Sequence, residues 1–408
     1  MADDTVGDVL RAERLRLRLT LEQAGRLIGF SSSTLSRIEH NLRRLDIEEL
    51  RAVASRYGIA PSRLGLATVD DQQHIDGSGG HVQRRQFLTA AAGLAVPYAV
   101  LARLDDALVA LPAARGQVTE STVTASMAVS QALFDRAQYT ALVAGLPGLL
   151  AAAHELADVH QDSRSQATVA ACYNLATHTL TKLGQHQVSR LTADRAMNHA
   201  RRADSPLALA LSARAIGVVL RHEGRPRIAQ RVTLGAIGAV QATGLTVPAE
   251  RAVLTQILCT AAYSAATNGD QDQAVDLIGA AEDAVCGLDR PVIVGGNAVT
   301  PAQVQLYKIG VHRAAGDSSQ ALDAARGLRP EHFATAERRS RLHTDLARAW
   351  WMHGRPEQTA AALLAAYHEA PTELTGRPAI RHIGLDLVRR HPHTSGAREL
   401  RLALRSSV

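Results

Sequence analysis

The stretch LTLEQAGRLIGFSSSTLSRIEHN, residues 19–41, decides the fold of the first part of the chain. Thr20 is a favourable N-cap residue, and Gly29 is a favourable residue at which to end a short helix. Ser31 is a second N-cap, and the apolar residues that follow it have helical spacing over residues 32–40. The stretch therefore predicts two short helices joined by a tight glycine turn.

Helical spacing extends in both directions from this stretch. Leu35 and Ile38 lie three positions apart, so both are expected on the buried face of the helix over residues 32–40. Three further helices are predicted, and each has an apolar face of its own. They are a first helix with Val6, Leu10, Leu15 and Leu17 on its apolar side, a fourth at Ile47–Tyr57 and a fifth at Pro61–Leu66. Five helices in about sixty residues indicate a helix-turn-helix unit.

Residues 5–66 resemble the DNA-binding domain of the phage-repressor family, also called the Cro/CI or xenobiotic-response-element family. The resemblance implies that Ser33–Glu39 forms the recognition helix, which enters the major groove of duplex DNA. The sequence departs from the family in three places. Leu21 stands where the family usually has glutamine, Gly25 where it favours alanine, and His40-Asn41 where a basic residue and glycine are common.

The recognition helix supplies the candidate DNA contacts. Side chains near its N-terminus are expected to reach base edges, where the fork of Arg37 can bind guanine through two hydrogen bonds. The candidate base contacts are Ser32, Ser33, Ser36 and Arg37, and the candidate backbone contacts are Arg18, Thr20, Asn41, Arg43 and Arg44. Two alternatives stay open: Arg37 can pair with a neighbouring carboxylate, and Arg43 and Arg44 can be solvated surface residues.

A linker and a second domain follow the DNA-binding unit. Residues 68–83 lose apolar periodicity and contain the run Gly77-Ser78-Gly79-Gly80, which is typical of a flexible linker. The sequence thus predicts a helix-turn-helix domain at residues 1–67, a linker at 68–83 and a large domain at 84–408. The large domain is rich in alanine and leucine with helical periodicity, so the predicted fold class is all-α.

Glycine-centred breaks recur through the large domain at intervals of 38–47 residues, and a small residue follows each break after five or six positions. This pattern resembles tetratricopeptide repeats, in which two helices pack closely around a turn. We therefore expect a tetratricopeptide-like α-solenoid that serves as a sensor and dimerisation domain. The breaks lie at Gly184, Gly224, Gly269, Gly316 and Gly354, and the small residues are Ser189, Ala229, Ala274, Ala321 and Ala360.

Such arrays bind ligands on the concave face, which the first helix of each pair lines. In the repeat family the groove-facing positions lie 13, 10, 6, 3 and 2 residues before each glycine, and none of the residues selected here is acidic. The candidate ligand-groove residues are Asn174, His178, Lys182, Arg214, Arg221, Tyr263, Arg313, Arg348 and Trp351; the same count also selects His222, Gln256, Gln303 and Arg341. A basic, partly aromatic groove favours a peptide or a small acidic ligand. The alternative is an arginine-rich solvated face or a dimer surface.

Composition limits the class of protein. The chain has 408 residues, a net charge of +6 and 45 basic residues, of which only Lys182 and Lys308 are lysines. This arginine bias indicates GC-rich coding, as in actinobacteria. The three cysteines form no paired motif, and no catalytic constellation is visible, so we expect no cofactor, no metal site and no enzymatic activity.

These observations together predict a cytoplasmic, sequence-specific transcriptional regulator that is not associated with a membrane. Its expected partners are double-stranded DNA with a palindromic operator, a second copy of the chain, and a peptide or small-molecule signal. The alternative is a DNA-localised scaffold for protein–protein interaction without a small ligand.

Overall fold

The chain consists of two compact units, Met1–Thr89 and Ala90–Val408, in the computed structural model. The predicted fifth helix, the predicted linker at 68–83 and the predicted DNA contacts Arg18, Asn41 and Arg44 lie outside the described residues. The structure describes residues 6–17, 19–39, 43, 45, 47–57, 59, 96–114 and 116–405.

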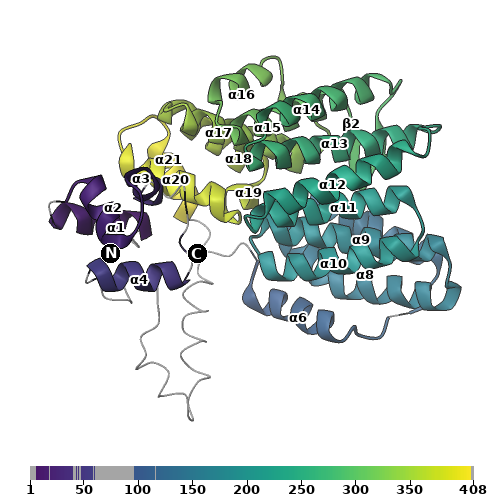
Figure 1. Ribbon diagram of the computed structural model, residues 1–408. Coiled ribbons are helices and arrows are strands. Elements are labelled where there is room, and N and C mark those ends of the chain that lie inside the picture. The colour runs from purple at the N-terminus through teal and green to yellow at the C-terminus, as the bar shows by residue number, and fades with distance from the viewer. Residues whose placement is uncertain are drawn as a thin grey trace, which may run out of the picture. The chain divides into compact units, whose positions relative to one another are not determined.

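The first unit contains four described helices around a small core (Figure 1). They are α1 (Val6–Arg16), α2 (Leu21–Ile28), α3 (Ser32–Glu39) and α4 (Ile47–Tyr57). Helices α2 and α3 pack against each other, and α1 and α4 each contact one of them. The predicted helix–turn–helix order is therefore confirmed for the described part of this unit.

Local hydrogen bonds explain where α2 and α3 begin and end. The Thr20 hydroxyl accepts from the Gln23 amide at 3.2 Å, and the Thr20 amide donates to the Gln23 side chain at 3.0 Å. Gly29 ends α2 with φ 84°, a left-handed conformation that glycine adopts without strain. The Ser31 hydroxyl then accepts from the Thr34 amide at 3.1 Å. Both predicted N-caps and the predicted helix end are confirmed.

The core of this unit confirms one part of the sequence pattern and corrects another. Leu35 and Ile38 are buried, as predicted. Leu15 and Leu17, expected on the apolar side of the first helix, are 58% and 37% exposed. Leu15 lies five residues after the buried Leu10, a rotation of about 140° around the helix, and α1 ends before Leu17.

Gly25 explains one departure from the family pattern. A β-carbon at this position would lie 2.5 Å from the carbonyl oxygen of Phe30, closer than atoms can approach. The Phe30 amide donates to the Gly25 carbonyl at 2.8 Å, which draws the turn against α2. Alanine at this position would therefore require the turn to move.

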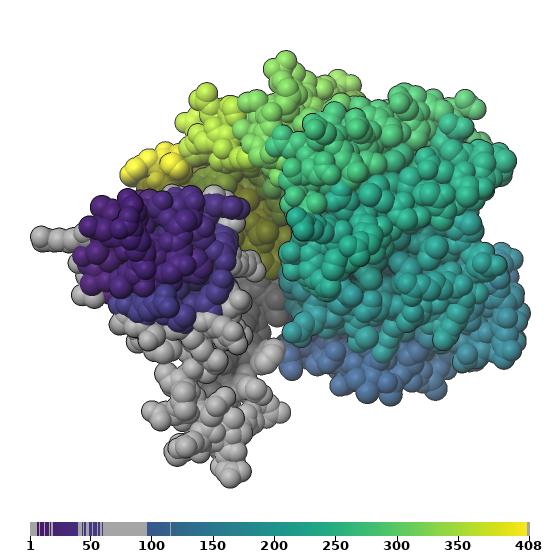
Figure 2. Space-filling view, in the orientation of Figure 1, coloured from purple at the N-terminus to yellow at the C-terminus, as the bar shows by residue number. Residues whose placement is uncertain are grey.

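The second unit is a stack of helices with one short hairpin. Its elements are α6 (Tyr98–Val109), α7 (Glu120–Asp135), α8 (Tyr139–His160), α9 (Ser163–Lys182), α10 (His186–Arg202), α11 (Pro206–His222), α12 (Pro226–Gln241), α13 (Pro248–Asn268), α14 (Gln271–Cys286), β1 (Val292–Val294), β2 (Asn297–Val299), α15 (Pro301–Ala314), α16 (Ser318–Ala324), the 3₁₀ helix η3 (Pro330–His332), α17 (Ala336–Met352), α18 (Pro356–Glu369), α19 (Pro371–Thr375), α20 (Pro378–Arg390) and α21 (Ala397–Arg405). Neighbouring pairs stack in chain order, so colour changes gradually across this unit in Figure 2.

The predicted repeat turns are confirmed at all five glycines. Each joins the two helices of a pair, from α9–α10 to α17–α18, and each has φ between 72° and 91°. Side chains with a β-carbon are strained in this region, so glycine makes the turn possible. The five small residues of the pattern are at most 1% exposed, because the second helix packs closely against the first there.

The first helices of successive pairs form the inner layer of the stack. Helices α9, α11, α13, α15 and α17 each pack against the next, and α10, α12, α14, α16 and α18 cover them. The expectation of a helical array is confirmed. It has one exception, the antiparallel hairpin β1–β2 between the third and fourth pairs, which turns at Gly295-Gly296.

The two ends of the array meet. In α19, the Thr372 hydroxyl donates to the carbonyl of Ala137, between α7 and α8, at 2.8 Å. Next to it, the hydroxyl of Tyr139 donates to the carboxylate of Glu373. Helix α17 also contacts α7. These contacts join the two ends of the inner layer, which would lie apart in an open solenoid.

Helix α8 is long and apolar enough to cross a membrane, by length and composition alone. Its side chains Leu142, Leu146 and Leu150 are completely buried, and it packs against α6, α7 and α9. These contacts make α8 a core helix of the second unit.

Candidate functional site

The inner helices of the second unit surround a cavity of about 1020 Å³. Its walls come from α7, α9, α11, α13, α15, α17 and α20, and from the tip of the β1–β2 hairpin. All nine candidate ligand-groove residues line this one cavity: Asn174, His178, Lys182, Arg214, Arg221, Tyr263, Arg313, Arg348 and Trp351. The sequence count thus selected side chains that the fold brings together, although it does not establish what they bind.

Two residues selected by the same count lie elsewhere. Gln256 is buried and its amide donates to the carbonyl of Val294 at 3.0 Å, so it holds the hairpin in place. Gln303 is buried in the first turn of α15. Neither of these two glutamines lines the cavity.

Two acidic residues that the count did not select also face the groove. Glu337 and Asp345 both line the cavity, beside eight arginine and lysine side chains. The lining also includes three side chains that the count missed, Tyr307, Arg338 and Arg377. Tyr307 lies nine residues before Gly316, and Asp345 lies nine residues before Gly354. Each is therefore one position away from the counted position ten residues before the glycine. Arg377 follows Gly354, the last of the five repeat glycines, so counting back from these glycines could not select it.

Five charged residues at the meeting of the two ends form what we call the closure cluster: Lys182, Glu337, Arg338, Glu373 and Arg377. Lys182 Nζ lies 2.6 Å from Glu337 and 2.7 Å from Glu373. Arg377 lies 2.7 Å from Glu373, and Arg338 lies 3.1 Å from Glu337. Both carboxylates are buried, yet these cations outweigh burial and lower the pKa of each.

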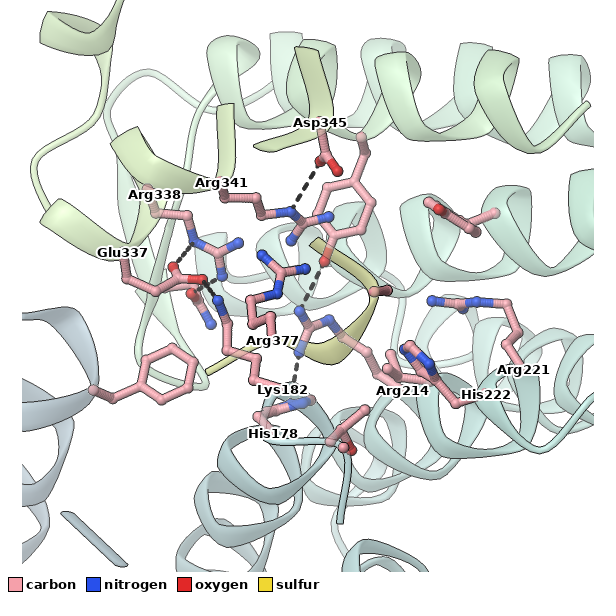
Figure 3. Close-up of a pocket in the computed structure, with 18 of the residues that line it drawn as sticks. His178, Lys182, Arg214, Arg221, His222, Glu337, Arg338, Arg341, Asp345 and Arg377 are labelled. Atoms are coloured by element: carbon pink, nitrogen blue, oxygen red, sulfur yellow. Dashed lines mark hydrogen bonds and ion pairs between the residues drawn. The ribbon is translucent and has the colours of Figure 1, made fainter. Parts of the chain in front are cut away.

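The rest of the polar wall, which we call the arginine–tyrosine cluster, consists of Arg214, Arg221, Tyr263, Tyr307, Arg313, Arg341, Asp345 and Arg348. Figure 3 shows Arg214 and Arg341 reaching toward each other from different helices. Arg214 Nη2 donates to the Tyr307 hydroxyl at 2.9 Å, and Arg313 donates to the Tyr263 hydroxyl. Within the described residues, no carboxylate pairs with Arg214, Arg221 or Arg313.

Two cavity histidines add no positive charge near pH 7. Burial, reinforced by the nearby guanidinium groups, lowers the pKa of His222 to about 3 and the pKa of His178 well below its usual value. The neutral ring of His178 can therefore accept from Arg214 Nη1, which lies 3.0 Å from its Nε2. The positive charge of the cavity comes from arginine and lysine.

We predict that Tyr307 ionises near neutral pH. Burial alone would raise its pKa, but Arg214, Arg341 and Arg338 outweigh burial and lower the pKa to about 7. Raising the pH through 7 should therefore form one tyrosinate, visible in near-ultraviolet absorbance. The Tyr307→Phe variant should lack this step.

The matched control is Tyr98→Phe, on α6 outside the cavity, which should keep the step near pH 7. A Tyr307→Phe protein that still forms a tyrosinate near pH 7 would contradict the assignment.

Helix α3 presents polar side chains to solvent. Ser32, Ser33 and Arg37 are exposed, and Ser36 is partly exposed. The Ser33 hydroxyl lies 3.0 Å from that of Ser31. Among the described residues no carboxylate forms an ion pair with Arg37, so the alternative of a paired Arg37 finds no support there. These four candidate base contacts share one helix.

Two candidate backbone contacts are described. Thr20 is exposed, and its hydroxyl oxygen accepts from an amide, which leaves its hydrogen free to be donated outward. Arg43 pairs with Glu49 at 2.8 Å and lies 5.0 Å from the ring centre of Phe30. Arg43 is therefore held in place on the protein rather than only solvated.

Comparison with known proteins gives two findings. Residues 10–64 match a protein-family model described as helix-turn-helix. Among solved structures, the chain is similar to the crystal structure of Bacillus thuringiensis PlcR in complex with the peptide PapR7 and DNA. The identity is 11%, the TM-score is 0.36, and the match covers 89% of this chain and 99% of that chain. No curated protein matches the chain.

Proposed function

We propose that the protein is a sequence-specific, DNA-binding transcriptional regulator whose repeat unit senses a peptide or small-molecule signal and dimerises. The single observation that carries the proposal is the helix-turn-helix domain at residues 10–64, whose α3 leaves Arg37 exposed and without a carboxylate partner among the described residues. A bacterial protein that binds duplex DNA acts in the cytoplasm. We propose no enzymatic step.

The repeat unit supports the sensing part of the proposal. Its cavity is of the size that small ligands occupy, and it collects arginine side chains from three helices of the array, α11, α15 and α17. The alternative function, a DNA-localised scaffold, would use a protein-binding face and would not need a cationic cavity among the inner helices. We therefore favour the sensor.

Dimerisation follows from the way such domains read DNA. One recognition helix contacts only a half-site, and two helices about one helical turn apart read a palindrome. We propose that a ligand in the cavity changes the population of dimers able to span both half-sites.

Salt and sequence dependence test the DNA-binding part. Affinity for the operator should fall steeply with salt concentration and should exceed affinity for random duplex by about a thousandfold or more. Equal affinity for all sequences would favour the scaffold.

We predict that Arg37→Ala relaxes recognition at one base pair. Loss of a bidentate contact to guanine costs about 1–3 kcal/mol of discrimination, which corresponds to roughly five- to a hundred-and-fiftyfold. Selection of bound sequences from a random library, done with both proteins, measures the change.

The companion variant is Arg43→Ala, whose side chain follows the recognition helix and should contact the phosphate backbone. It should weaken binding to all sequences alike. An Arg37→Ala protein with an unchanged sequence preference would remove Arg37 from the base-reading residues.

A further inference from the structure

The same arrangement of three side chains occurs twice in the arginine–tyrosine cluster. In the first, Arg214 donates to the Tyr307 hydroxyl while Arg341 Cζ lies 4.4 Å from the centre of the Tyr307 ring. In the second, Arg313 donates to the Tyr263 hydroxyl while Arg221 Cζ lies 4.6 Å from the centre of that ring. Each tyrosine is thus held between two guanidinium groups, one at its hydroxyl and one over its face.

These two arrangements concentrate positive charge that carboxylates balance only in part. Together with Arg348, the cluster has five guanidinium groups but one carboxylate, Asp345. The Asp345 carboxylate lies 3.4 Å from Arg341 and 3.7 Å from Arg348. Burial, the largest cause, and neighbouring guanidinium groups lower the pKa of Arg221 and Arg348 to about 10, so holding these charges inside the protein is costly. An anionic ligand would relieve this cost.

Two arginine nitrogens of the cluster also lack a hydrogen-bond partner among the described residues. Arg214 is 6% exposed, and its Nε has no partner within the described residues; the same holds for the Nε of Arg313. Buried donors are normally satisfied, and an unmade bond costs about 1–3 kcal/mol. Both side chains line the cavity, so these unpartnered donors lie at the wall of the space that a ligand would occupy.

The excess of positive charge indicates which anionic group of a ligand fits the cavity best. A single carboxylate, such as the C-terminus of a peptide, brings one negative charge and would leave most of the guanidinium groups unpaired. A phosphate ester brings about 1.5–2 negative charges at pH 7 and several acceptor oxygens, which arginine binds through two parallel hydrogen bonds.

We infer that the cavity binds a phosphate-bearing small molecule, with its phosphate held by the two arginine–tyrosine arrangements. The inference rests on the proposed sensing function and specifies its ligand. The tyrosine hydroxyls occupy the guanidinium donors in the absence of ligand. The phosphate oxygens take over these donors when it binds.

Inorganic pyrophosphate is a suitable probe, and succinate is a dianion without phosphate. Calorimetry on the full-length protein at constant ionic strength should show pyrophosphate binding more tightly than succinate or an acidic hexapeptide. Arg214→Gln and Arg313→Gln should each weaken pyrophosphate binding about tenfold or more, because each removes a charged hydrogen-bond donor.

The matched control is Arg231→Gln, an exposed arginine on α12 outside the cavity, which should leave pyrophosphate affinity unchanged. Removing one of several crowded cations should not prevent folding, and tryptophan fluorescence checks this, since Trp350 and Trp351 both lie in the repeat unit. Equal pyrophosphate affinity in all four proteins, no binding to the wild type, or tighter binding of succinate or the peptide would each overturn the inference.

DNA binding separates this inference from the proposed function. If pyrophosphate binds with the expected variant pattern but leaves operator affinity unchanged, the phosphate site stands and ligand sensing fails. If an unphosphorylated peptide changes operator affinity and pyrophosphate does not bind, sensing stands and the phosphate inference fails.

Discussion

Replacing Glu373 with glutamine should destabilise the repeat unit by about 3–5 kcal/mol, because it leaves Arg377 without a carboxylate partner among the described residues and Lys182 with Glu337 alone. Glu373 is completely buried and lies 2.7 Å from both Lys182 and Arg377. It also accepts from Tyr139, near the other end of the array. Loss of this charge should open the contact between the ends. Urea unfolding followed by tryptophan fluorescence measures the effect on this unit alone.

The control for this prediction is Glu155→Gln, an exposed position on α8, which should change stability by less than about 0.5 kcal/mol. The double variant Arg377→Met with Glu373→Gln should recover part of the loss, because it removes the cation that Glu373→Gln leaves without a carboxylate. A Glu373→Gln protein as stable as the wild type would show that the closure cluster does not hold the ends together.

Acid should act on the same cluster. The pKa values of Glu337 and Glu373 are lowered in the folded protein, so their contribution to stability is fully present above the usual value of 4.5. It is lost as the pH falls below 4.5 through the lowered values. Glu373→Gln should therefore show a shallower loss of stability in acid than the wild type.

Replacing Glu39 with glutamine should unfold the DNA-binding unit and abolish specific DNA binding. Glu39 is buried and pairs with Arg14 through two hydrogen bonds, at 2.6 Å and 2.8 Å. Breaking such a pair leaves Arg14 buried and charged, at a cost of about 3–5 kcal/mol, which is much of the stability of a small domain. Operator binding and amide hydrogen exchange in α1–α4 measure the outcome.

A second carboxylate in the same unit provides the contrast. Glu22 pairs with Arg26 at 2.6 Å, but both side chains are more than two-thirds exposed. Glu22→Gln should therefore cost less than about 0.5 kcal/mol and leave DNA binding intact. If Glu39→Gln behaves like Glu22→Gln, then the Arg14–Glu39 pair is not needed for the fold.

Local chemistry explains which parts of the fold were predictable. Thr20, Gly29 and Ser31 act through atoms within a few residues of themselves, so their roles as caps and turn follow from the sequence. The five repeat glycines are predictable for the same reason. Leu15 was misplaced because its apolar character alone does not show which helix face meets the core.

The candidate cavity was predictable in part. Groove positions counted from each glycine found cavity residues because a helix presents every third or fourth side chain to one face. Counting positions from the glycines did not show which charged residues form ion pairs with each other. It placed Lys182 in the groove, but Glu373 lies 191 residues further along the chain, and only the meeting of the two ends brings these residues together.

The sequence by itself determined the helix-turn-helix unit, the helical pairs and the excess of arginine, since these depend on local propensity and composition. Tertiary structure decided where the excess charge is balanced. Long-range packing gives Lys182, Arg338 and Arg377 carboxylate partners, while the arginines around Tyr263 and Tyr307 share only one. A carboxylate neutralises a buried cation only within a few ångströms, and the array sets those distances when its ends meet.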